Sequence, residues 1–165
     1  MILSVSPPGG DFTEPVTQAC LRTTGSFLML DTSLAHSRHF PAINWFQSYS
    51  LYGKDVLEHY EKKVSPEWEP LKRRCRQMLQ QEQAIREVAE IVGAEGLQDA
   101  DRLLMRTAER VRTEFLGQNA YSDDAFSPPE KTLAILKRIL ENHDLTATKL
   151  KQGVSLEEAM KTEDR

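Results

Sequence analysis

The sequence predicts a mainly α-helical fold: a C-terminal helical bundle preceded by the edge of an α/β sheet, with about two parallel strands and short helices. Two observations predict this fold. Residues 51–165 carry 41 of the 46 charged side chains, and apolar residues recur there at helical spacing. Residues 1–50 are sparsely charged and hold seven prolines and glycines. We therefore divide the chain into residues 1–50, the C-terminal part of an α/β domain, and residues 51–165, the helical bundle domain.

The first part of the chain predicts strand, helix, strand and a further short helix. Ile2–Val5 is a short apolar run that stops at prolines and glycines. Glu14–Thr23 is a plausible helix with Pro15 in its first turn, and Phe27–Leu30 is typical of a buried strand. Asp31 then offers an N-cap for a short helix. A crossover of about 20 residues between two strands favours parallel pairing.

The second part predicts helices whose ends are marked by caps and glycines. A helix opens at Ser65-Pro66-Glu67 and ends at Gly93, and a second helix ends at Gly117. The chain restarts at Ser127, and Ser155 to Glu158 form a capping box for a last short helix. A weaker amphipathic segment, Val56–Val64, precedes them all. The apolar stripes are Trp68, Leu71, Cys75, Met78, Ile85, Val88 and Val92; Leu104, Ala108, Val111 and Phe115; and Leu133, Leu136, Leu140 and His143.

Composition excludes several classes of protein. The 165 residues carry a net charge of −4, which argues against binding nucleic acid or an acidic membrane through a basic surface. The longest strongly apolar run, Phe27–Leu30, is far shorter than the roughly 20 residues of a membrane span. The N-terminus has no basic region typical of a signal peptide. Cys20 and Cys75 stand alone, which favours a reducing compartment over a disulfide framework or a zinc site.

No residue pattern predicts a complete active site. The one Gly-Lys pair, Gly53-Lys54, lacks the other glycines and the hydroxyl of a phosphate-binding loop, so we interpret Gly53 as a helix-entry residue. His36 and His39 can share a helix face but lack a third metal ligand, and we expect no metal site. We interpret the remaining polar candidates as structural, with the glutamates on a solvated face: His59, His143, Glu82, Glu87 and Glu90.

The function of this chain is indicated by the resemblance of several motifs to those of a known protein family. The motifs that carry it are Ser6–Gln18, Arg38–Trp45, Ser48–Tyr52, Val64–Trp68, Ile91–Gly93, Asp101–Leu103 and Phe115–Tyr121. In this order they resemble the catalytic A subunit of V-type and archaeal A-type rotary H⁺-ATPases, or ATP synthases, over nearly the whole chain. The resemblance implies the last stretch of a RecA-like nucleotide-binding domain followed by the whole C-terminal bundle. It also implies that the residues that bind phosphate and Mg²⁺ lie upstream of Met1, so ATP or ADP with Mg would be held only partly by this chain, which has no catalytic residue of its own.

The resemblance assigns two aromatic residues to an adenine pocket. Phe40 matches the aromatic that stacks on the adenine ring, and Tyr121 stands where relatives have a second aromatic of the same pocket. A flat π-face beside an apolar wall binds a nucleobase well. The alternative, that both aromatics fill the core, stays open from the sequence.

Other residues match surfaces that face the rotating central stalk. Gly9, Gly10 and Asp11 match a loop near the rotor axis. The helix-turn-helix segment that includes Glu95, Gly96, Leu97, Gln98 and Asp99 matches a stalk-contacting turn that is more acidic in related catalytic subunits. Trp45–Ser50 contains no arginine, whereas the non-catalytic partner subunit supplies an arginine finger at the equivalent place. This difference favours the catalytic type of subunit.

The resemblance therefore implies a part of an ATP-coupled proton or sodium pump or synthase, cytoplasmic and peripheral to the membrane. Its partners would be the central stalk and the non-catalytic B subunit, and the exposed sheet edge would favour self-association of the chain. The alternative is a stand-alone helical interaction module without catalysis. Both interpretations predict no ATP turnover by this chain alone, because groups that position the phosphates are missing.

Overall fold

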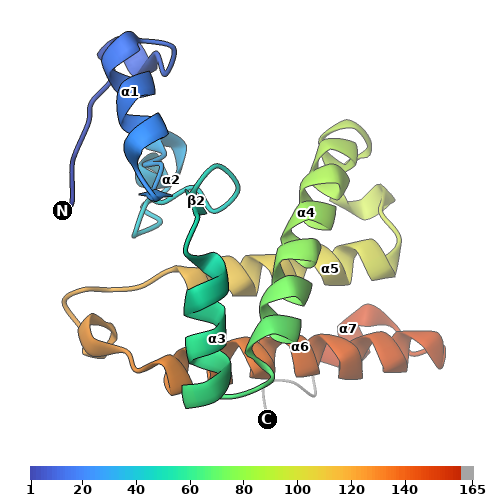
Figure 1. Ribbon diagram of the computed structural model, residues 1–165. Coiled ribbons are helices and arrows are strands. Elements are labelled where there is room, and N and C mark those ends of the chain that lie inside the picture. The colour runs from blue at the N-terminus through green and yellow to red at the C-terminus, as the bar shows by residue number, and fades with distance from the viewer. Residues whose placement is uncertain (161–165) are drawn as a thin grey trace.

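A computed structural model describes residues 1–160, in which a small N-terminal unit leads into a helical bundle (Figure 1). The N-terminal elements are η1 (Pro8–Gly10), α1 (Pro15–Thr23), β1 (Ser26–Phe27), α2 (Thr32–His36) and β2 (Tyr49–Ser50). The bundle elements are α3 (Gly53–Lys63), α4 (Trp68–Val92), η2 (Ala94–Gly96), α5 (Asp99–Arg110), η3 (Val111–Leu116), η4 (Asp123–Phe126), α6 (Pro129–Lys151) and α7 (Leu156–Met160). None of these helices is both long and apolar enough to cross a lipid bilayer.

The predicted helix starts of the N-terminal unit are confirmed by their caps. The side chain of Glu14 accepts a hydrogen bond from the backbone N–H of Thr17 at 2.8 Å, which opens α1. The side chain of Asp31 accepts from the backbone N–H of Ser33 at 2.8 Å, which opens α2. Each carboxylate satisfies an N–H that has no partner inside its helix, and it lies at the positive end of the helix dipole.

The prediction of two parallel strands is wrong. The strand that includes Phe27 pairs with β2, and the pairing is antiparallel, with Ser26 opposite Ser50 and Phe27 opposite Tyr49. Leu30, predicted to be buried, is 73% exposed and forms only an isolated antiparallel bridge to Ile43. Ile2–Val5 is not assigned to a strand. The chain between β1 and β2 folds back over its own short helix rather than crossing a sheet, so the two short strands run in opposite directions.

The core of the bundle lies where α4, α5 and α6 meet. Cys75, Met78 and Leu79 of α4 pack there with Ala108 at the end of α5, Val111 of η3, and Leu136, Ile139 and Leu140 of α6. Helix α4 begins at Trp68 rather than at Ser65, while Gly93 ends it as predicted. Gly53 opens α3, as expected of a helix-entry residue, and Ser155 caps α7. The bundle and most of its helix ends are therefore confirmed.

The last turns of α4 differ from the predicted stripe. Val88 and Val92 are expected from their spacing to face the core, but they are 50% and 53% exposed, and neighbouring Ile91 is 85% exposed. In Figure 1, the C-terminal half of α4 rises above α5 and α6. Helix α4 thus has a buried middle and a projecting end.

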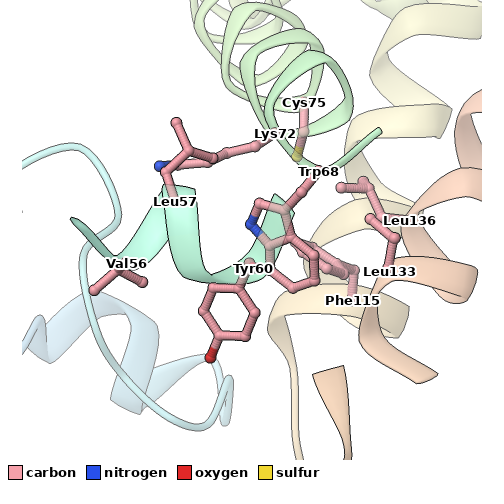
Figure 2. A pocket seen from close by; sticks show the side chains of 9 residues that line it. All are labelled: Val56, Leu57, Tyr60, Trp68, Lys72, Cys75, Phe115, Leu133 and Leu136. Atoms are coloured by element: carbon pink, nitrogen blue, oxygen red, sulfur yellow. The ribbon is translucent and has the colours of Figure 1, made fainter. Parts of the chain in front are cut away.

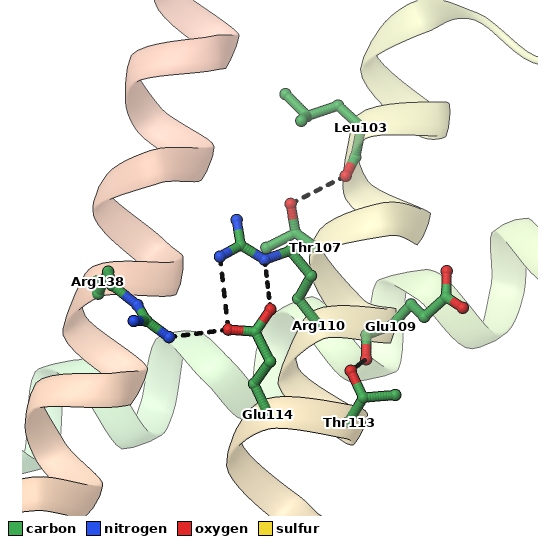
Figure 3. A network of polar contacts seen from close by, with 7 residues as sticks. All are labelled: Leu103, Thr107, Glu109, Arg110, Thr113, Glu114 and Arg138. Carbon is green, nitrogen blue, oxygen red and sulfur yellow. Dashed lines mark hydrogen bonds and ion pairs between the residues drawn. The ribbon is translucent and has the colours of Figure 1, made fainter. Parts of the chain in front are cut away.

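The end of the α5 helix widens into a π-helical segment, η3, at Val111–Leu116. Figure 3 shows how this segment is tied to its neighbours. Glu114 accepts hydrogen bonds from Arg110 at 2.7 Å and from Arg138 of α6 at 2.9 Å, and these bonds, above all that from Arg110, lower the pKa of its carboxyl group. π-Helical turns are rare and are frequently found at functional sites. Here the turn contains Phe115 and Leu116, the first two residues of the motif Phe115–Tyr121.

Candidate functional site

The structure brings two of the sequence motifs into direct contact. The backbone N–H of Gln118 donates a hydrogen bond to the backbone carbonyl of Phe40, with an N–O distance of 2.7 Å. Phe40 belongs to the loop that links α2 to β2, and Gln118 belongs to the loop that follows η3. This contact joins the N-terminal unit to the helical bundle through segments that are far apart in the sequence. We call the surface formed by the Phe40 loop and the Gln118 loop the wall.

The loop that carries Phe40 is held by an aspartate and an asparagine. Asp31 accepts a hydrogen bond from the Asn44 side-chain amide at 2.8 Å, and the Asn44 side-chain oxygen accepts from the backbone N–H of Phe46 at 3.0 Å. The hydrogen bonds from Ser33 and Asn44 hold the pKa of Asp31 at about 2, so the carboxylate stays charged at neutral pH. Trp45 and Phe46 pack against the bundle core. Polar bonds on one side and apolar contacts on the other fix the loop.

Neither predicted adenine-pocket aromatic belongs to the core. Phe40 is 54% exposed and Tyr121 is 100% exposed. Within the described residues, neither ring is packed into the core. The loop of Tyr121 is ordered by its own hydrogen bonds, since the side-chain oxygen of Asn119 accepts from the backbone N–H of Tyr121 at 3.0 Å. An aromatic face left open to solvent beside an ordered loop is able to stack on a planar ligand.

The surroundings of His39, which is next to Phe40, disfavour the charged form of its imidazole. Burial lowers the pKa of its imidazole, and the positive charge of Arg112 lowers it further. The ring lies edge-on to Trp45 with a centroid distance of 5.7 Å. The folded state therefore disfavours protonated His39, so the free energy of unfolding falls as the pH drops below the ordinary pKa of 6.5 toward the lowered pKa of the folded state. At neutral pH, His39 acts as a packing residue in this wall.

Gly117 fits its place only because it lacks a side chain. A Cβ atom there would lie 2.9 Å from the backbone oxygen of Thr113 and 3.1 Å from that of Arg112. We expect Gly117→Ala to lower the free energy of unfolding by about 1–3 kcal/mol, since the backbone of η3 must shift. Urea denaturation measures this change. Gly53→Ala is the matched control, because no atom lies within 4 Å of the place its methyl group would take, and an equal loss in both variants would contradict the expectation.

The residues matched to the stalk surface lie on exposed turns. Gly9 and Gly10 have φ angles of 61° and 75°, a left-handed conformation that favours glycine, and the side chain of Asp11 accepts from the backbone N–H of Thr13 at 2.9 Å. Glu95, Gly96, Gln98 and Asp99 are exposed and Leu97 is half-buried at the end of the α4–α5 turn. In Figure 1, the turn before α1 and the α4–α5 turn both lie toward the top of the view.

The described residues do not supply a metal centre. Residues 1–160 contain no cluster of three or more His, Cys, Asp or Glu side chains placed to hold a metal ion. His36 and His39 are not joined by further ligands there. The structure thus brings Phe40 and the Gln118 loop together by a backbone hydrogen bond.

Sequence reasoning missed an apolar pocket in the bundle (Figure 2). The pocket has a volume of about 320 Å³ and is lined by Val56, Leu57, Tyr60, Trp68, Lys72, Cys75, Phe115, Leu133 and Leu136. The Tyr60 and Trp68 rings stack at its edge with centroids 4.4 Å apart. Its residues come from four elements, and such a convergence has no local signal in the sequence. It lacks convergent polar groups that would orient a nucleotide.

The pocket predicts a difference between the two cysteines. Burial raises the pKa of the Cys75 thiol to about 11, so at pH 8 only about one molecule in a thousand carries the reactive thiolate. Cys20 is half-exposed. We expect a disulfide reagent to modify Cys20 first and Cys75 only after unfolding. The time course of labelling in the Cys20→Ser variant measures this, and fast modification of its folded form would contradict the expectation.

Two family models match the chain. Residues 57–160 match the C-terminal domain of V and A type ATP synthase, and residues 1–50 match the nucleotide-binding domain of the ATP synthase alpha/beta family. A solved structure of an ATP synthase subunit, NeqB from Nanoarcheaum equitans, aligns with a TM-score of 0.70 at 24% identity, and covers 83% of this chain and 32% of that one. This likeness concerns the fold.

Three curated relatives, each an A subunit of an A-type ATP synthase, match over nearly the full length of the chain. The relative from Staphylothermus marinus is 41% identical over 98% of this chain, and that from Methanopyrus kandleri is 42% identical over 96%. The relative from Methanosarcina barkeri is 43% identical over 100%. The chain spans only 28%, 27% and 29% of the lengths of these relatives. On the match of its helical part, the chain belongs to the family of C-terminal domains of V and A type ATP synthases.

Proposed function

We propose that this chain supplies the adenine-facing wall and the helical lever of the catalytic A subunit of a V/A-type rotary ATPase or ATP synthase. One observation carries the proposal: the hydrogen bond of 2.7 Å from the Gln118 N–H to the Phe40 carbonyl. It joins the motif of the N-terminal unit to the motif that follows the bundle's π-helical turn. With the family match on both sides of this contact, the open rings of Phe40 and Tyr121 are the natural surface for adenine.

The chemistry of phosphate transfer would be supplied outside this chain. The sequence has no phosphate-binding loop, and residues 1–160 offer no cluster of ligands for magnesium. ATP or ADP would therefore contact this chain through its base, while the triphosphate and Mg²⁺ are held elsewhere in the same active site. When bound, the metal would neutralise charge on the phosphates. The chain's own residues bind and orient the base.

The projecting end of α4 is suited to act as the lever. Its last turns and the α4–α5 turn stand clear of the bundle, with exposed Val88, Ile91 and Val92 on the helix. A rotating stalk would contact Glu95–Asp99 here and Gly9–Asp11 at the turn before α1. The non-catalytic B subunit would complete the head, and the whole assembly would lie in the cytoplasm, peripheral to the membrane. In this proposal, residues 1–50 are the C-terminal part of the nucleotide-binding domain and residues 51–165 are the helical bundle domain.

The test is assembly with the partner subunits. We expect the purified chain to hydrolyse no ATP, and to form a complex with the central stalk and the B subunit that elutes together in size-exclusion chromatography. Leu97→Asp in the α4–α5 turn should weaken the contact with the stalk, and Leu51→Asp, at an exposed position outside the turn, is the control. ATP turnover by the chain alone would contradict the proposal. So would a complex that is equally stable with both variants.

A further inference from the structure

The sequence around Glu82 predicts that this residue lies on a solvated face. The structure shows that it is buried instead. It sits in the middle of α4, and the residue is only 4% exposed. One carboxylate oxygen accepts from Nε of Arg86 at 3.0 Å, and the other accepts from Nη1 of Arg112 at 2.8 Å. Desolvating such a group is costly, and apolar residues of similar volume often stabilise a fold as well or better. The arrangement therefore calls for a role beyond stability.

The partner of Glu82 leads directly to the proposed adenine wall. Arg112 lies in the π-helical turn η3, and its backbone carbonyl accepts a hydrogen bond from the N–H of Gly117 at 2.7 Å. The next residue, Gln118, donates to the carbonyl of Phe40 at 2.7 Å. Three hydrogen bonds, linked through the covalent chain of Arg112 and of Gly117-Gln118, thus connect the middle of α4 to Phe40.

We infer that Glu82 is a positioning residue: by holding Arg112 against α4, it fixes the Gly117–Tyr121 loop and Phe40 relative to the lever helix. The inference rests on the proposed function and names the residue that links its two parts. Helix α4 is continuous from Glu82 to its projecting end at Val92. A displacement of that end is transmitted to η3 at Glu82, and from η3 to the wall.

The π-helical geometry of η3 sets the position of the loop that follows it. A π-helical turn holds one residue more than an α-helical turn, so a return to α-helix would shift Gly117 and the loop behind it. Glu82 on α4 and Arg138 on α6 hold the side chains of Arg112 and Glu114 from two sides. We expect the loss of either contact to loosen η3 and the loop that follows it.

Amide hydrogen exchange of the full chain tests the inference without any nucleotide. In Glu82→Gln we expect the Gln118 amide, which donates to Phe40, to exchange at least about tenfold faster, while slow amides of α6 keep their rates. Asp144→Asn is the matched control, because it breaks another ion pair of α4, with Arg74, that is not part of the path. An unchanged Gln118 amide overturns the inference, and so does an equal acceleration of all slow amides.

A second variant and a second measurement keep the test decisive. If Glu82→Gln does not fold, Arg112→Lys retains the charge but not the guanidinium geometry, and the same selective acceleration at Gln118 is expected. We further expect Glu82→Gln to weaken ADP binding about 2- to 30-fold in a titration followed by NMR. If the unmodified chain binds no ADP, the proposed function fails, whereas the exchange experiment still decides whether Glu82 positions the loop.

Discussion

Phe40→Ala is expected to weaken the binding of adenine nucleotides to the chain by about 1–3 kcal/mol, the usual contribution of one aromatic ring stacked on a base. Each 1.4 kcal/mol corresponds to a tenfold change in the dissociation constant. The ring is 54% exposed, so its removal leaves no core cavity, and the effect should fall on binding rather than on folding. Titration of the chain with ADP, followed by NMR chemical shifts, measures the change.

The matched control for this variant is Phe126→Ala. Phe126 is 93% exposed and lies in η4, outside both motifs of the proposed wall. The Phe126→Ala variant should bind ADP with the same affinity as the unmodified chain. Tyr121→Ala is expected to weaken binding in the same direction as Phe40→Ala, because both rings are proposed to face the base. Equal affinities of the Phe40 and Phe126 variants would contradict the assignment of Phe40.

Ile139→Ala is expected to have the largest effect on stability. Ile139 is 0% exposed and lies in the core where α4, η3 and α6 meet. Truncating a buried isoleucine leaves a cavity and costs about 2–5 kcal/mol in the free energy of unfolding. For a chain of this size, that loss lowers the Tm by about 4–20 °C. Thermal unfolding followed by circular dichroism measures the shift.

Leu145→Ala on the same helix is the control for the core variant. Leu145 is 63% exposed, so we expect its truncation to change the free energy of unfolding by no more than about 0.5 kcal/mol. Both substitutions place alanine in α6, so differences in helix propensity are small. If the two variants unfold at the same temperature, the packing of α6 against α4 described here is wrong.

The helices could be predicted from the sequence because their signals are local. Asp31 caps α2 through an N–H two residues away, and Gly93 ends α4 with a φ angle of 79° that favours glycine. Strand pairing has no such local signal. Phe27 reaches its partner Tyr49 only through the intervening loop, and strands of two residues carry no alternating pattern that would fix their direction.

Residues of the site could be predicted from the sequence only where they lie in motifs that resemble the family. Phe40 is found through its motif, but its contact with Gln118 is a backbone bond that no side-chain pattern encodes. The burial of Glu82 escapes prediction for a physical reason. An arginine four residues on, Arg86, is as typical of a solvated ion pair as of a buried one, and the deciding partner, Arg112, comes from another helix. The π-helical turn likewise depends on tertiary packing.

The most direct measurement of the central claim is the contact between the base and the chain. We propose an NMR experiment on the isotope-labelled chain with saturating ATP, recording nuclear Overhauser effects between the adenine protons and aromatic side chains. Contacts to the rings of Phe40 and Tyr121 are the predicted result. Contacts only to Tyr60 and Trp68 at the apolar pocket, or none to any aromatic ring, would contradict the account.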